Sequence, residues 1–289
     1  MQRLKGKIAV VTGASRGGGR GIALVLGEEG ATVYVTGRSV RGGPTTDDLP
    51  GTVEETAEQA TARGGVGIPV HCDHTVDVQV EALFERVERE QGRLDVLVNN
   101  VWGGYEGKGN ENVLGNWSFW EEPVWVWDKM FQAGVRAHYA ASRLAARLMV
   151  PRRQGLIVST TFRDPRGKYL GDVPYDVSKA AINRMAYGIG LHLRAYNVAV
   201  VALSPGWMRT EAVMSNKPPH GRPLPGEVEQ TESVEYVGRA VAALAADPNV
   251  MQKSGRTLTV GELAQEYGFT DVDGRYVPPF RIPEESLMD

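Results

Sequence analysis

A tyrosine and a lysine four residues apart are suited to acid–base chemistry. Tyr175 and Lys179 open a predicted helix, where this spacing puts both side chains on one face about one turn apart. A free tyrosine has a pKa of about 10, and each unit of downward shift requires about 1.4 kcal/mol of phenolate stabilisation. Since a nearby ammonium can supply part of it, the pair predicts a tyrosine that exchanges a proton near neutral pH.

A glycine-rich segment near the N-terminus has the composition of a phosphate-binding loop. It reads Thr12-Gly13-Ala14-Ser15-Arg16-Gly17-Gly18-Gly19-Arg20-Gly21. Gly13, Gly17 and Gly19 accept backbone angles that other residues resist, and they let a pyrophosphate approach main-chain N–H groups at the start of a helix. Its position between a predicted strand and a predicted helix favours a nucleotide site over an ordinary turn.

The elements that must position these residues alternate between strand and helix. Short runs rich in valine and isoleucine precede longer segments with helical spacing, which predicts parallel strands joined by crossover helices. The expected strands are 8–12, 32–36, 67–72, 94–99, 155–160, 198–204 and 257–260. The expected helices are 19–29, 52–63, 77–91, 124–149, 175–195 and 234–246. Strands this apolar need cover on both faces, so we expect an α/β fold with a Rossmann-type doubly wound parallel sheet of about seven strands.

The chain is predicted to form a single domain. We expect a dinucleotide-binding catalytic domain over residues 1–273, followed by a C-terminal tail over 274–289. Two irregular stretches interrupt the alternation: an excursion at 102–123 and a proline-bearing flap at 214–233. Neither has the character of a linker between two cores.

The order of these motifs resembles the short-chain dehydrogenase/reductase family. The glycine spacing is similar to the family's Thr-Gly-x-x-x-Gly-x-Gly fingerprint, and Asn99-Asn100-Val101-Trp102-Gly103 is similar to its Asn-Asn-Ala-Gly element. The resemblance is nearly continuous over residues 5–210, with closest likeness to the branch that includes dehydrogenase/reductase family member 1. It implies an oxidoreductase that transfers hydride between a nicotinamide and a small-molecule carbonyl or alcohol.

The resemblance also implies roles for individual residues. Tyr175 becomes the catalytic acid/base, while Lys179 activates it and holds the cofactor ribose. Asp73 is similar to the aspartate that contacts the adenine. The other cofactor contacts expected from the loop, the fourth strand and the turn near the nicotinamide carboxamide are Gly13, Ser15, Arg16, Gly17, Gly19, Asn99, Pro205, Gly206 and Thr210.

Charge at the end of the second strand bears on the choice of cofactor. An acidic residue there would accept hydrogen bonds from a ribose 2′-hydroxyl and repel a 2′-phosphate. The strand instead ends at Arg38, which together with Arg16 could clamp that phosphate by charge-assisted hydrogen bonds. We therefore expect NADP in preference to NAD, the alternative being two arginines on a solvated loop.

The sequence departs from the family pattern at three positions. The usual serine lies 12 to 14 residues before the tyrosine, where Thr161 offers a hydroxyl instead, with Ser159 or Thr160 as alternatives. Gly134 stands where the family has an asparagine, so a proton relay through that asparagine is rerouted or absent. Gly18 replaces a bulky apolar residue in the glycine loop.

Two tryptophans are candidates for the substrate pocket. Trp102 follows the fourth strand and Trp207 follows the Pro-Gly turn, and both places border the nicotinamide in the family. Aromatic walls suit an aromatic or apolar substrate. Packing against the sheet or a neighbouring subunit is the alternative.

Composition argues against several other classes of protein. A formal net charge of −3, from 32 basic and 35 acidic residues, gives no basis for nucleic-acid binding. No uninterrupted apolar run reaches about 18 residues, so no membrane partner is expected. The single cysteine, Cys72, agrees with a cytoplasmic location. No metal site is expected at 71–74, because successive side chains on a strand point to opposite faces.

One different class of function remains open. A dinucleotide-binding scaffold or sensor with little catalysis would also explain the altered serine and asparagine positions, although it would have no chemical need for both Tyr175 and Lys179. The resemblance further implies a homodimer or homotetramer that associates through the long helices at 124–149 and 175–195.

Overall fold

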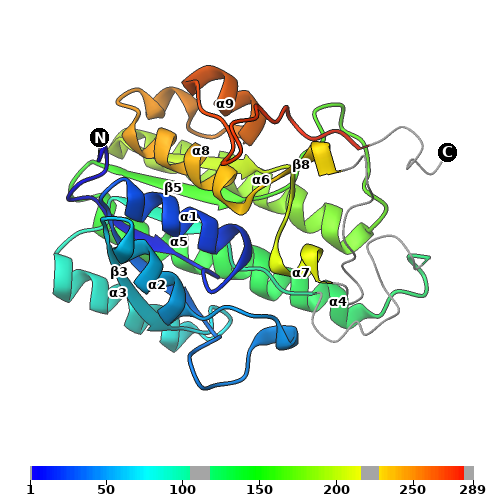
Figure 1. The fold of residues 1–289 in the computed structure, drawn as a ribbon, viewed down its shortest axis with the longest axis horizontal. Helices are drawn as coiled ribbons and strands as arrows, with labels where there is room; N and C mark the ends of the chain where they lie inside the picture. Colours follow the sequence, from blue (N-terminus) through cyan, green and yellow to red (C-terminus); the bar gives the residue numbers. More distant parts are fainter. Residues whose placement is uncertain (1, 105–117, 216–227, 283–289) are drawn as a thin grey trace.

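A seven-stranded parallel sheet forms the centre of the protein. The computed structural model describes residues 2–104, 118–215 and 228–282. The strands are β1 (Ile8–Val11), β2 (Thr32–Gly37), β3 (Val66–His71), β4 (Val96–Asn99), β5 (Gly155–Thr160), β6 (Val198–Ser204) and β9 (Thr257–Thr259). Their order is β3-β2-β1-β4-β5-β6-β9, and every neighbouring pair is parallel. This arrangement confirms the predicted Rossmann-type sheet (Figure 1).

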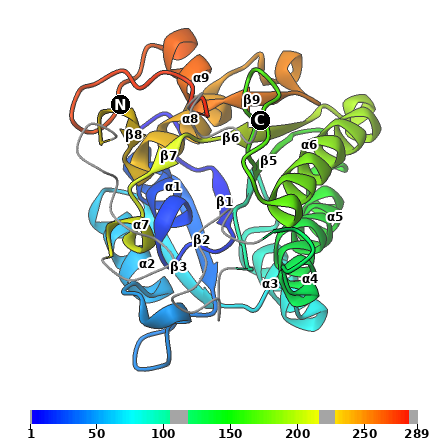
Figure 2. The same cartoon turned by 90° about the vertical axis from the view of Figure 1, so that its right-hand side faces the viewer.

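Helices cover both faces of this sheet, as a doubly wound fold requires. The long helices are α1 (Gly17–Glu28), α2 (Val53–Ala62), α3 (Asp77–Gln91), α5 (Ala137–Met149), α6 (Val173–Leu193), α8 (Val234–Ala246) and α9 (Val260–Tyr267). Alternate residues of one strand enter opposite cores: Ala9 and Val11 pack with α1, α2, α8 and α9, whereas Ile8 and Val10 pack with α3, α5 and α6. Figure 2 shows α5 and α6 on one side of β1 and α1 on the other.

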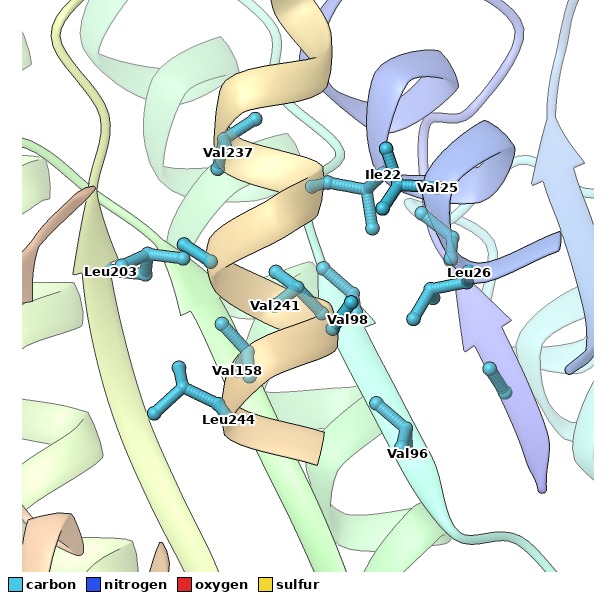
Figure 3. Packing of buried hydrophobic residues seen from close by; sticks show 14 of the residues in the cluster. Ile22, Val25, Leu26, Val96, Val98, Val158, Leu203, Val237, Val241 and Leu244 are labelled. Atoms are coloured by element: carbon cyan, nitrogen blue, oxygen red, sulfur yellow. The ribbon is translucent and has the colours of Figure 1, made fainter. Parts of the chain in front are cut away.

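The first of these cores depends on a close approach between α1 and α8. Val241 and Leu244 of α8 and Ile22 of α1 point into the same apolar cluster above β4 and β5 (Figure 3). A Cβ added at Gly21 would lie 1.7 Å from the Val234 carbonyl oxygen. Glycine therefore lets the two backbones meet and seats the start of α1 firmly beside the sheet.

The predicted helix over 124–149 is interrupted. It comprises α4 (Val124–Lys129), a π-helical segment (Met130–Arg136) and α5. Gly134 lies in the π-helical segment, and the ring of Trp102 packs directly against it. π-Helical turns inside helices are frequent at functional sites.

Several short elements were not expected from the sequence. Helix α7 (Glu211–Met214) follows the Pro-Gly turn, and β7 (Trp207–Met208) pairs in parallel with β8 (Thr231–Glu232). Single 3₁₀ turns occupy Thr46–Asp48, Arg194–Tyr196, Val228–Gln230 and Val250–Lys253. Residues 105–117 of the predicted excursion and 216–227 of the predicted flap lie outside the described residues.

The described part of the C-terminal tail packs on the domain. Val277 and Ile282 are buried, and the Tyr236 hydroxyl donates to the Val277 carbonyl oxygen at 3.0 Å. The backbone N–H of Ile282 donates to Asp164 Oδ2 at 2.8 Å. Across the described residues, no helix has both the length and the apolar character needed to cross a membrane.

Candidate active site

A cavity of about 460 Å³ lies at the carboxyl ends of the central strands, where the strand order reverses between β1 and β4. One continuous lining brings together most of the predicted site residues. These are Gly13, Ser15, Arg16, Gly17, Arg38, Asp73, Trp102, Thr161, Tyr175, Lys179, Pro205, Gly206, Trp207 and Thr210. Gly19 and Asn99 lie behind the lining; Asn99 is fully buried, and its Nδ2 donates to Ser142 Oγ at 2.9 Å.

Two of the three glycines singled out in the glycine loop have the unusual backbone angles predicted for them, and Gly19 does not. Gly13 and Gly17 have φ angles of +64° and +58°, in the left-handed region. A Cβ at Gly13 would lie 2.8 Å from the Val101 Cα, so the loop after β4 presses closely on the glycine loop. Asn100 Nδ2 donates to the carbonyl oxygens of Thr12 and Gly13 at 3.2 and 3.0 Å, which ties the two loops together.

A carboxylate already lies at the start of α1. The Gly17 N–H donates to Glu211 Oε2 at 2.7 Å, and the other carboxylate oxygen lies 3.4 Å from Arg20 Nη1. Backbone N–H groups at a helix start favour anions, so Glu211 marks the point where a pyrophosphate would fit. Sequence reasoning missed this residue because 194 positions separate it from Gly17.

The two arginines proposed as a phosphate clamp have different surroundings. Arg16 donates from Nη2 to Ser39 Oγ at 2.8 Å and from Nε to the Pro50 carbonyl oxygen at 3.1 Å, so it holds the loop after β2. Arg38 is exposed and lines the cavity. Burial raises the pKa of Asp73, but hydrogen bonds from Thr75 and the charge of Arg38 outweigh it and lower this pKa.

Cys72 and His74 also line the cavity, and both are neutral near pH 7. His74 Nε2 lies 2.7 Å from Thr36 Oγ1, and Cys72 Sγ lies 4.0 Å from His74 Nδ1. Burial raises the pKa of the Cys72 thiol to about 12 and lowers that of His74 to about 4. Within the described ranges no group of three or more histidine, cysteine or acidic side chains is placed to hold a metal ion.

Helix α6 carries Tyr175 and Lys179, the pair expected to exchange the proton. The Asp172 side chain accepts a hydrogen bond from the Tyr175 N–H at 2.7 Å and so caps the helix. The Tyr175 ring contacts Trp102 edge-to-face, with centroids 5.6 Å apart, and lies 6.0 Å from the Phe162 ring. Lys179 Nζ lies 5.3 Å from the Tyr175 ring centroid, which confirms that both side chains share one face.

Burial shifts the pKa values of Tyr175 and Lys179 in opposite directions. Desolvation raises the pKa of Tyr175, and the charges of Asp172 and Asp176 raise it further. Desolvation lowers the pKa of Lys179 to about 7. In the chain alone the tyrosine pKa thus moves opposite to the expected direction, and near neutral pH the phenol keeps its proton.

Hydrogen bonds to neighbouring segments hold the turn at 205–210, which is expected to contact the nicotinamide carboxamide. The Arg209 N–H donates to the Glu232 carbonyl oxygen at 2.8 Å, which extends the β7–β8 pairing. Thr210 Oγ1 accepts from the Val213 N–H at 3.2 Å and caps α7, so its own O–H remains able to donate.

Comparison with known proteins agrees with this arrangement. Residues 7–220 match the short chain dehydrogenase family. The chain belongs to the short-chain dehydrogenase/reductase family. It is therefore an NAD(P)-dependent oxidoreductase acting on CH–OH or C=O groups.

Individual relatives of the short-chain dehydrogenase/reductase family agree over nearly the whole chain. Dehydrogenase/reductase SDR family member 1 of Mus musculus is 43% identical and that of Homo sapiens 41%, each over 96% of this chain and 87% of the relative. A solved 7α-hydroxysteroid dehydrogenase, complexed with NADH and 7-oxo glycochenodeoxycholic acid, superposes with a TM-score of 0.71. It is 25% identical and the match covers 89% of this chain and 94% of that structure.

The structure locates the hydroxyls near the family's serine position. Thr161 lines the cavity, and its Oγ1 donates to the Lys179 carbonyl oxygen at 3.1 Å. Thr160 also lines the cavity, whereas Ser159 accepts from Asn99 Nδ2 at 3.3 Å and lies behind it. The single proton of Thr161 is thus held by the backbone of α6.

At Gly18 and Gly134, the other two positions that differ from the family pattern, another side chain fills the space beside the glycine. Met208 Sδ lies 3.1 Å from the position a Cβ would take at Gly18, so this side chain occupies the neighbouring space. At Gly134 the nearest atom to an added Cβ is Trp102 Cζ3, at 2.6 Å. In both cases a side chain from a distant segment packs against the glycine.

Proposed function

We propose that this chain is an NADP(H)-dependent oxidoreductase that interconverts a carbonyl and an alcohol, with Tyr175 as the acid/base and Lys179 as its electrostatic activator. The observation that carries the proposal is the single cavity that runs from Arg38 at the end of β2 to Tyr175 at the start of α6. That cavity has an anion-binding end and a proton-exchanging end.

Residues at the anion-binding end fit a dinucleotide. The Gly17 N–H already donates to a carboxylate, so a pyrophosphate would take the place of Glu211. Arg38 is proposed to meet the 2′-phosphate and Asp73 the adenine, with Arg16 supporting the loop instead of acting as an equal partner. When bound, NADPH supplies the hydride.

Residues at the proton-exchanging end of the cavity supply the proton and orient the substrate. Tyr175 is a neutral phenol near pH 7, the form that donates a proton to a carbonyl oxygen as the alcohol forms. The Lys179 ammonium lies beside it and stabilises the phenolate that remains. Thr161 would orient the substrate oxygen once its O–H turns from the backbone of α6.

The walls at this end favour an apolar or aromatic substrate. Trp102, Phe162 and Trp207 all line the cavity, and the rings of Trp102 and Phe162 lie beside that of Tyr175. Large rings bury apolar area with few torsions to restrict. Apolar ketones, including a steroid ketone of the kind bound by the solved relative, belong in any substrate screen.

Incubation of the protein with NADPH or NADH and a panel of aromatic ketones, steroid ketones, aldehydes and quinones tests the proposal. Loss of NADPH absorbance with at least one class, greater than with NADH, is the expected result. Tight NADPH binding without turnover of any substrate would favour the alternative of a cofactor-binding scaffold or sensor.

We also propose self-association through the outer helices. A shallow hollow on α4, the π-helical segment, α5 and α6 has Phe131, Val135, Tyr139 and Met185 in its lining, together with Asp128, Lys129, Gln132 and Arg136. Sedimentation should give a homodimer or homotetramer, and a monomer at all concentrations would contradict this. The cytoplasmic location remains a prediction from the sequence.

A further inference from the structure

The ring of Trp102 contacts both members of the catalytic pair. Lys179 Nζ lies 3.4 Å from the centroid of the indole, over its face. The edge-to-face contact with Tyr175 places the same ring beside the phenol. Trp102 therefore does not only line the substrate pocket: its ring also contacts the Lys179 ammonium that is proposed to stabilise the Tyr175 phenolate.

Gly134 makes room for this ring. A Cβ at this position would lie 2.6 Å from Trp102 Cζ3 and 2.8 Å from Cε3, distances at which the ring has to move. The glycine lies in the π-helical segment, which carries the backbone past the indole. The tryptophan and the glycine thus form a matched pair from segments that are distant in sequence.

We propose that Trp102 is a positioning residue for the reaction: its indole face holds the Lys179 ammonium in the charged form beside Tyr175, and Gly134 makes the space that this requires. The inference rests on the proposed roles of Tyr175 and Lys179 and extends them. An ammonium with one side against a ring keeps N–H donors for the cofactor ribose.

Electrostatics explain why such a contact matters here. Lys179 is 8% exposed, and burial alone shifts its pKa, with no contribution from a described carboxylate. The other titratable groups around the pair are Asp172 at the N-cap of α6, Asp176 on α6, His138 on α5 and His74, whose charge acts on His138. Burial and the charge of Lys179 lower the pKa of His138 to about 3, so it stays neutral. The negative face of an indole offsets part of the desolvation of a buried cation.

Trp102→Leu tests this role in the protein without cofactor. The readout is the pH dependence of reductive methylation of Lys179, followed by mass spectrometry of the peptide. We expect the midpoint to fall by about one pH unit, equivalent to about 1.4 kcal/mol. Trp102→Phe keeps an aromatic face and should lower the midpoint by less than about half a unit.

A kinetic measurement supplies the second readout. Carbonyl reduction needs Tyr175 protonated and Lys179 charged, so its rate falls as pH rises through the pKa of Lys179. If Trp102→Leu lowers that pKa, this fall in rate should occur at lower pH. Gly134→Ala, which displaces the ring without altering it, should shift the fall in rate in the same direction. Trp120→Leu, at a tryptophan that is 73% exposed, is the matched control and should shift nothing.

The outcomes separate the inference from the proposed function. If the indole only excluded water, its loss would hydrate the ammonium, and the methylation midpoint would rise or stay unchanged. That result, or an equal loss of rate at every pH in Trp102→Leu, overturns the positioning role of Trp102. The proposed function then still stands if the Tyr175→Phe variant is inactive. Full activity of Tyr175→Phe would overturn both.

Discussion

Tyr175 and Lys179 differ in what burial does to them, and this difference suits proton donation. The phenol keeps its proton because desolvation and two nearby aspartates raise its pKa. The ammonium is close to its titration point because desolvation lowers its pKa to about 7. A protonated tyrosine beside a charged lysine is thus the form present below about pH 7, and carbonyl reduction is the direction that this form favours.

The pKa of Lys179 predicts how carbonyl reduction depends on pH. Its side chain is charged below a pKa of about 7 and neutral above it, so stabilisation of the phenolate is lost as pH rises. The kcat/KM for NADPH, which reports on the free enzyme, should fall through about pH 7 during carbonyl reduction. Initial rates measured from about pH 5 to 9 check this, and a constant value through pH 9 would contradict it.

Arg38 provides a test of cofactor preference. In Arg38→Glu we expect the KM for NADPH to rise about 10- to 100-fold, because a charge-assisted contact worth about 1.5–3 kcal/mol is replaced by repulsion. The KM for NADH should change far less. Arg41→Glu is the matched control, since Arg41 is exposed and pairs with Glu58. Equal effects of Arg38→Glu on both cofactors would reject the assignment.

Sequence reasoning found residues whose role follows from local spacing and missed partners that depend on folding. Tyr175 and Lys179 share a helix, so a four-residue spacing was enough to place them together. The bonds of Arg16 to Ser39 and Pro50, and that of Thr161 to Lys179, depend on loop paths. No periodic pattern encodes such paths.

At the scale of elements, apolar runs predicted the sheet well because burial on both faces leaves a strong signal. The predicted strands 155–160 and 198–204 coincide with β5 and β6. The predicted helix 124–149 missed its π-helical break, since apolar spacing does not reveal that Trp102 packs at Gly134. Helix α7 has four residues, too few for a periodic pattern.

That short helix carries the carboxylate that meets the glycine loop. Because Glu211 accepts from the Gly17 N–H, it would compete with a pyrophosphate for the same donor. Glu211→Gln should lower the dissociation constant of NADPH about threefold to tenfold, measured by nucleotide fluorescence in low salt, because a nearby negative charge is removed. The exposed Glu229 provides the control variant Glu229→Gln. Weaker NADPH binding by Glu211→Gln would show that the carboxylate supports the site instead.

For the whole molecule, stability depends on the contact between α1 and α8 that seats the phosphate loop. Gly21→Ala should lower the free energy of unfolding by several kcal/mol, since its Cβ would lie 1.7 Å from the Val234 carbonyl oxygen. Gly188→Ala in α6 should raise it by about 0.5–1 kcal/mol, because no atom lies within 4 Å of the added Cβ. Urea unfolding compares the two, and similar values would contradict this packing.

The proposed function joins the fold, the cavity and the Tyr175–Lys179 pair: a dinucleotide would bind at the carboxyl ends of the central strands, and Tyr175 of α6 would donate the proton. Single-turnover oxidation of bound NADPH by a carbonyl substrate, in wild type and Tyr175→Phe, tests that description most directly. Loss of the phenolic proton should slow this step about 10²- to 10⁴-fold while NADPH binding stays unchanged. A Tyr175→Phe variant that turns over at the wild-type rate would contradict the account.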